Sequence, residues 1–134
     1  PQEVINSYIK VRPNPTLADI GVLQQRRIFD HVCAVSGEIP PVLDSRDVLM
    51  DPARVLGLLC QRVGVHFDER MLSWPAGPRD TDGVWAPYWY DAVWASTGFA
   101  PYRAKDEPVP SHLTGLLDAA NDLYLALYEH RLGQ

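Results

Sequence analysis

The sequence has few of the features that would commit it to a nucleic acid or a membrane. Its twelve Lys and Arg residues are outnumbered by seventeen Asp and Glu, which gives a net charge of −5 without a basic cluster. A phosphate backbone is therefore not an expected partner. Its apolar runs are also short: "VLGLLC" and "LYLALY" have six residues each, against about 20 for a helix that spans a bilayer. Neither a nucleic acid nor a membrane is expected among the partners.

The chain is equally poor in residues for disulfides, metal sites and phosphate loops. Its two cysteines, Cys33 and Cys60, both fall in apolar helical stretches, which favours reduced thiols in a cytoplasmic protein over a disulfide or a metal site. No two of its four histidines have the spacing of metal ligands, so no metal is expected. The sequence also lacks a Gly-rich phosphate loop of the Walker type.

What the sequence does contain is helical periodicity. With 134 residues, of which 46% are hydrophobic, the chain has the length of about one domain. Start and stop signals predict four longer helices, which lie between Pro1 and Pro13, from Thr16 to Gly37, from Asp51 to Gly64, and from Pro110 or Ser111 onward. Asp68 is expected to cap one further turn that ends near Leu72.

One segment has the pattern of a strand. "IPPVLDSRDVL" holds a short apolar run around Val42 and Leu43, and a lone buried strand cannot satisfy its own backbone N–H and C=O groups. A helix–strand–helix order is typical of an α/β protein with a parallel sheet. The fold class expected is therefore α/β, with this chain supplying a mostly helical C-terminal portion and one or two strands. The other strands are expected upstream of Pro1 or in a second copy, so Pro1 is interpreted as a truncation.

Two stretches of the chain resemble a known family. "PQEVINSYIKVR", followed by "PPVLDSRDVLMDPARVLGLLCQRVGVHFDERML", is similar to the C-terminal half of a bacterial-type sulfotransferase. In that family an Arg-Asp-Pro precedes a helix that carries a Ser. A strand, a polar Arg/Glu-Asp-Leu element and a helix started by Asp-Pro follow further on. "SWPAGPRDTDGVWAPYWYDAVWASTGF" resembles the subgroup often labelled sulfotransferase-like or branched-chain-aminotransferase-like. The resemblance covers residues 1 to about 100.

The resemblance implies a P-loop-type α/β fold, with residues 1–134 as the C-terminal part of a single domain, and 3′-phosphoadenosine 5′-phosphosulfate as sulfuryl donor. The family holds the 3′-phosphate with the Arg and the Ser of its first motif. Ser7 matches that Ser, and the Arg would precede Pro1. A hydroxyl suits this role because it donates a charge-assisted hydrogen bond to a phosphate oxygen. Taken without the resemblance, Ser7 reads as an ordinary exposed helix serine.

Arg79 is the second nucleotide-binding candidate. Some sulfotransferases close the nucleotide site with an Arg-Lys-Gly loop, and "RDTDGVW" resembles that loop without its Lys-Gly. Asp80 and Asp82 follow Arg79 within three residues, and their charges would repel a phosphate. A solvated loop arginine is therefore the alternative interpretation. The family's Gly-rich loop and its usual catalytic base both lie upstream, so the catalytic residues of this chain are unknown.

The densest aromatic stretch follows that loop. Trp85, Tyr88 and Trp89 are candidates for the wall of an acceptor pocket, on a segment expected to be helical after Pro87. The alternative is that this helix packs its rings into the core, because aromatic side chains dominate burial.

Two classes of function agree with these observations. The first is part of a sulfotransferase that acts on a small hydroxyl or amine acceptor and is inactive as residues 1–134 alone. The second is a non-catalytic helical interaction or regulatory module derived from the same fold. In either case the expected strand has an open edge, which invites pairing with a second copy of the chain.

Overall fold

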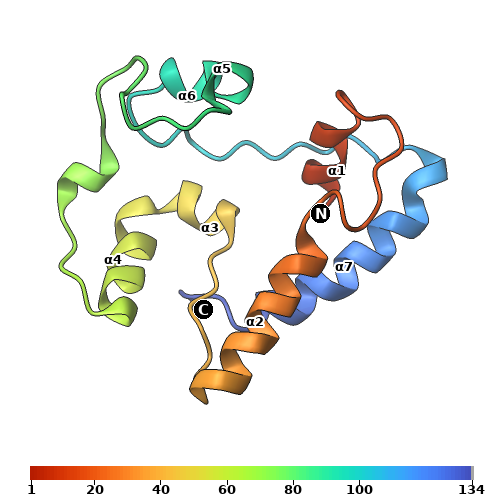
Figure 1. Cartoon of the computed structure of the whole chain (residues 1–134), viewed down its shortest axis with the longest axis horizontal. Helices are drawn as coiled ribbons and strands as arrows, with labels where there is room; N and C mark the ends of the chain where they lie inside the picture. The colour runs from red at the N-terminus through yellow and green to blue at the C-terminus, as the bar shows by residue number, and fades with distance from the viewer. Residues whose placement is uncertain (134) are drawn as a thin grey trace. The chain divides into compact units, whose positions relative to one another are not determined.

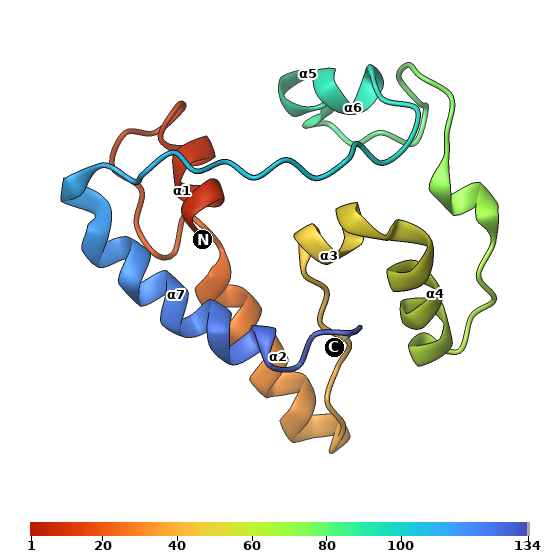
Figure 2. The same cartoon turned by 180° about the vertical axis from the view of Figure 1, so that it is seen from behind.

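A computed structural model describes residues 1–133. The chain divides into two compact units. The first, called the helical unit, consists of residues 1–42 and 103–132; the second, called the capped unit, consists of residues 43–102 together with Gly133. Figures 1 and 2 show their secondary-structure elements. Within residues 1–133 no helix is both long and apolar enough to cross a membrane.

The helical unit is built around two long helices, α2 (Val22–Ser36) and α7 (Thr114–Tyr128), which lie side by side in both views (Figures 1 and 2). A short helix, α1 (Gln2–Tyr8), and a single 3₁₀ turn, η2 (Ser111–Leu113), complete it. Its buried apolar residues are Ile5, Val22, Phe29, Leu113, Ala120 and Leu127. The expected first and last helices are confirmed as α1 and α7, and each contributes buried apolar residues to this core.

The start of α2 differs from the prediction. The Thr16 backbone N–H and hydroxyl both donate to the Asp19 carboxylate, at 2.8 and 2.6 Å, as in the expected capping box. They close a separate turn, however, and α2 begins only at Val22. The reason is Gly21, whose φ of 81° lies in the left-handed region that a helix does not continue through. The predicted end at Gly37 is confirmed by its own positive φ of 70°.

The expected strand is reduced to a single pairing in the described residues. Val42 forms an isolated parallel bridge with Arg131, and the Leu132 N–H donates to the Val42 carbonyl at 2.9 Å. The helices α2 and α7 run in the same direction, and each leads into one side of this bridge (Figure 1). Residues 1–133 are thus mostly helical. The β bridge that joins the segment after α2 to the segment after α7 is parallel.

The capped unit begins with three aspartate-capped elements. These are α3 (Ser45–Met50), α4 (Pro52–Val63) and the 3₁₀ turn η1 (Glu69–Leu72). Their caps Asp44, Asp51 and Asp68 accept hydrogen bonds from backbone N–H groups two or three residues on, at 2.9, 3.2 and 2.9 Å. Such caps satisfy N–H groups that a helix start leaves without partners. The caps at Asp51 and Asp68 were predicted, whereas α3 was read as the end of the strand.

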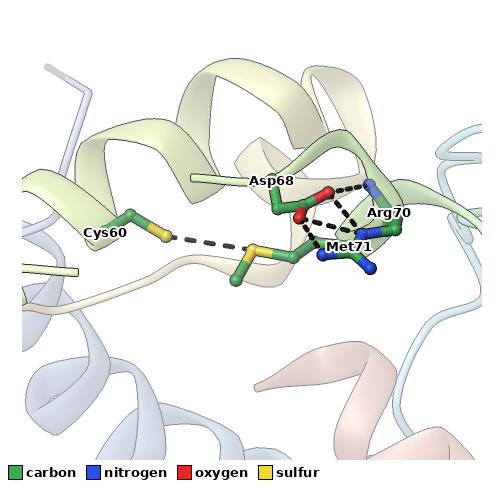
Figure 3. Close-up of polar contacts among 4 residues, drawn as sticks. All are labelled: Cys60, Asp68, Arg70 and Met71. Atoms are coloured by element: carbon green, nitrogen blue, oxygen red, sulfur yellow. Dashed lines mark hydrogen bonds and ion pairs between the residues drawn. The ribbon is translucent and has the colours of Figure 1, made fainter. Parts of the chain in front are cut away.

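A sulfur contact joins the turn η1 to α4, and an ion pair lies within the turn and its cap, as Figure 3 shows. The Sγ of Cys60, which is buried in α4, lies 3.9 Å from the Sδ of Met71. The Arg70 guanidinium folds back onto Asp68, with its Nε 2.9 Å from Oδ2. Both cysteines are free thiols: Cys60 is buried and Cys33 half-buried.

Candidate functional site

Ser7 lies on the exposed side of α1, two residues after the fully buried Ile5. The helix is tied down by two amide side chains. Gln2 Nε2 and Asn6 Nδ2 both donate to the carbonyl oxygen of Glu107, at 2.8 and 2.6 Å. A buried Ile5 and this double tie hold α1 in place from one side, and Ser7 is exposed to solvent.

Arg79 lies in a closed turn rather than in an extended loop. The Asp82 N–H donates to the Arg79 carbonyl at 3.0 Å, and the Arg79 N–H donates to Asp82 Oδ2 at 2.9 Å. The guanidinium makes a longer hydrogen bond, with its Nη2 3.3 Å from the Pro75 carbonyl oxygen. The turn therefore fixes the backbone at Arg79 while a weak contact orients its charged end.

Asp82 has a partner that the sequence did not reveal. The indole N–H of Trp94 donates to the same Oδ2 at 2.7 Å. This bond, the Arg79 backbone N–H and the Arg79 charge together lower the pKa of the Asp82 carboxyl below its usual 3.8, against a smaller opposing effect of partial burial. Asp82 was expected to repel a phosphate, but its Oδ2 accepts hydrogen bonds from the Trp94 indole and the Arg79 N–H.

The aromatic stretch divides into two groups with different environments. It forms two single-turn helices, α5 (Ala86–Trp89) and α6 (Asp91–Trp94), instead of one longer helix. The Tyr90 and Trp94 rings pack together edge to face, with centroids 6.5 Å apart. In contrast, the side chains of the acceptor-wall candidates Trp85, Tyr88 and Trp89 are 70%, 76% and 62% exposed. Within residues 1–133 these three rings therefore do not pack into the core.

The candidate residues fall into two sets. Arg79 and the three exposed aromatic residues belong to the capped unit, whereas Ser7 belongs to the helical unit. Among residues 1–133 no three His, Cys, Asp or Glu side chains gather closely enough to hold a metal ion. The groups available to a ligand are thus a hydroxyl on one unit, and a guanidinium with exposed rings on the other.

Comparison with known proteins decides the family. The model of the sulfotransferase domain matches residues 1–130. This chain belongs to the sulfotransferase domain family. Two curated relatives from Arabidopsis thaliana, branched-chain-amino-acid aminotransferase-like proteins 1 and 2, are 35% and 31% identical to it over 130 residues. No solved structure matches the chain.

The relatives of this sulfotransferase-family chain are much longer than the chain itself. Each alignment covers 97% of the chain but only 23% of the relative. The resemblance read from the sequence, which ended near residue 100, extends on this comparison to residue 130. The last helix, α7, therefore lies within the matched region and is part of the family's domain.

Proposed function

We propose that residues 1–134 form the C-terminal part of a sulfotransferase, which transfers a sulfuryl group from 3′-phosphoadenosine 5′-phosphosulfate to a small hydroxyl or amine acceptor. The observation that carries the proposal is the family match over residues 1–130. It is supported by Ser7, which lies on an exposed helix face and resembles the family's phosphate-binding Ser in its sequence context. The reaction is assigned to the cytoplasm, because free thiols persist in a reducing compartment.

The same proposal extends to the fold. The parallel bridge between Val42 and Arg131 follows two helices that run in the same direction. We take this bridge as the margin of a P-loop-type parallel sheet whose other strands lie outside residues 1–133. Parallel sheets are covered by helices on their faces, which is the role that α2 and α7 would have.

Each candidate residue has a definite task in this reaction. The Ser7 hydroxyl donates to the 3′-phosphate, and the Arg79 guanidinium supplies charge to the nucleotide. The exposed rings of Trp85, Tyr88 and Trp89 offer an apolar wall to the acceptor. The acceptor oxygen or nitrogen bonds to sulfur as the bond from sulfur to the leaving phosphate oxygen breaks. The base that removes the acceptor proton is not among the residues assigned here.

Nucleotide binding tests the proposal directly. The full-length protein is titrated calorimetrically with 3′-phosphoadenosine 5′-phosphate and, as a control, with adenosine 5′-phosphate. We expect the first to bind at least about tenfold more tightly, since only it carries the phosphate that Ser7 would contact. No binding of either nucleotide would refute the sulfotransferase and would favour the non-catalytic module instead.

A further inference from the structure

A segment of the capped unit, residues 73–98, is tied at its two ends. Ser73 and Gly98 form an isolated antiparallel bridge, and the Trp74 N–H donates to the Thr97 carbonyl at 3.1 Å. A Cβ at Gly98 would lie 3.1 Å from the Leu72 carbonyl oxygen, so the two chain segments of this neck approach closely and a larger residue would require a small shift. We call residues 73–98 the excursion.

Tryptophan side chains tie the excursion together above its neck. Trp74 donates its indole N–H to the Ser96 hydroxyl at 2.9 Å and packs edge to face on Phe99, with ring centroids 5.3 Å apart. Trp94 makes two ties at once: its carbonyl accepts from the Gly77 N–H at 2.8 Å, and its indole N–H donates to Asp82. Hydrogen bonds thus join the two ends of the excursion to each other, and one from Trp94 joins its C-terminal end to Asp82 in its middle.

Asp82 links these hydrogen bonds to the candidate site residues. One carboxylate oxygen, Oδ2, accepts both the Arg79 N–H and the Trp94 indole N–H. Arg79 precedes Asp82 in the same turn, while Trp94 ends the helix α6 that directly follows the exposed rings of α5. A single atom therefore joins the turn that carries the nucleotide candidate to the segment that carries the acceptor candidates.

We infer that Asp82 is a positioning residue that holds Arg79 and the exposed α5 rings of Tyr88 and Trp89 in place through one contact, so that nucleotide and acceptor recognition depend on the same carboxylate. The inference rests on the proposed function for the ligands, but its geometry is independent of them. Hydrogen bonds to an ionised acceptor are about twice as strong as neutral ones, which suits an atom that must fix two elements. A merely local role would stabilise the turn without linking the two ligands.

The first arm of the test measures the contact itself. Protein labelled with ¹⁵N-tryptophan reports each indole N–H by NMR, and Trp94→Phe identifies the Trp94 signal. We expect Asp82→Ala to speed hydrogen exchange of that indole at least about tenfold, while Asp82→Asn, which keeps one acceptor oxygen, restores most of the protection. Asp80→Ala is the matched control, because Asp80 is an exposed carboxylate in the same turn. Unchanged indole exchange in Asp82→Ala overturns the inference.

The second arm measures both ligands in the full-length protein. Asp82→Ala and Trp94→Phe should each raise the Kd of 3′-phosphoadenosine 5′-phosphate and the KM of a small phenol about tenfold. Arg79→Ala should change only the nucleotide Kd, Trp89→Ala only the acceptor KM, and Asp80→Ala should weaken neither. If Asp82→Ala lowers Tm but leaves both ligand constants unchanged, Asp82 does not position the site and the inference fails.

The two proposals fail in different ways. Wild-type protein that binds no nucleotide refutes the proposed function, and the indole exchange of Trp94 still decides whether Asp82 holds the excursion. Wild-type protein that binds nucleotide, with an Asp82→Ala variant that binds it equally well, refutes the positioning role alone. If Asp82→Ala does not fold, Trp94→Phe, which removes the same hydrogen bond, keeps the ligand arm of the test decisive.

Discussion

The paired helices of the helical unit and the excursion of the capped unit are ordered by different interactions. Between α2 and α7 the buried residues are apolar, among them Val22, Phe29 and Leu127, and the helices satisfy their own backbones. In the excursion, regular structure is limited to two single turns, and indole and carboxylate hydrogen bonds connect its parts. Apolar burial is non-directional, whereas a hydrogen bond requires a defined distance and angle between its donor and its acceptor. The excursion is thus the region whose geometry single polar changes should alter most.

The largest expected effect concerns the catalytic groups, which neither region supplies. Residues 1–134 expressed alone should give no sulfuryl transfer with labelled donor and a panel of phenols, alcohols and amines. The sequence holds no Gly-rich phosphate loop, and loss of even one transition-state donor typically costs about 10²–10³ in rate. Turnover above background would show that residues 1–134 do contain the catalytic groups.

The same material should also associate. The Val42 segment pairs on one side with Arg131, and an unpaired strand edge is a template for another chain. Light scattering should therefore report dimers or larger species for residues 1–134. A stable monomer would mean that the parallel bridge is not the margin of a sheet.

The apolar character of the helical unit predicts the next effect. Ile5→Ala should lower the free energy of unfolding by about 2–5 kcal/mol, the usual cost of deleting a fully buried aliphatic group, because Ile5 is 0% exposed. Ile28→Ala on α2 is the control, since Ile28 is 64% exposed and should cost under about 0.5 kcal/mol. Urea unfolding measures both, and equal losses would contradict the burial assigned to α1.

A polar change in the helical unit should affect binding rather than folding. Ser7→Ala should weaken 3′-phosphoadenosine 5′-phosphate by about 1.5–3 kcal/mol, which is roughly tenfold to a hundredfold in affinity. Its unfolding free energy should hardly change, because Ser7 is exposed. Adenosine 5′-phosphate is the control ligand: an equal loss for both nucleotides would mean that Ser7 does not contact the 3′-phosphate.

The smallest effect is a pH dependence confined to the excursion. The folded-state pKa of Asp82 lies below 3.8, so its stabilising contribution is complete above about pH 3.8 and is lost as the pH falls through the lowered pKa. The Trp94 indole should therefore lose exchange protection in acid, and Asp82→Asn should remove that pH dependence. Protection that falls instead as the pH rises would contradict the ionised form as the acceptor.

The elements that were predicted correctly carry their signals within a few residues. Asp51 and Pro52 indicate the start of α4, and Gly64, with its positive φ of 73°, indicates its end. The helix α3 was missed because Asp44 caps it directly after the apolar run read as a strand. The break at Tyr90 was not predicted either, although four aromatic side chains in six residues could not all face one side of a helix.

The contacts that organise the candidate site could not be read in this way. Asp82 and Trp94 are 12 residues apart and Trp74 and Ser96 are 22 apart, and no local pattern specifies such pairs. The turn from Arg79 to Asp82 does have a local signal, an Asp three residues after the N–H that it accepts. Exposure of Trp85 and Tyr88 depended on where the chain turned, which the sequence did not indicate.

The tie between α1 and Glu107 has a consequence for which substitutions the protein tolerates. Both Gln2 and Asn6 donate to a main-chain oxygen, which has two lone pairs and is present whatever side chain position 107 carries. Replacing Glu107 by almost any residue should leave the attachment of α1 intact, whereas losing either amide removes part of it. A saturation-mutagenesis screen should therefore find that position 107 accepts many residues, whereas positions 2 and 6 accept few. Residues that contact each other would then differ in the substitutions that they tolerate.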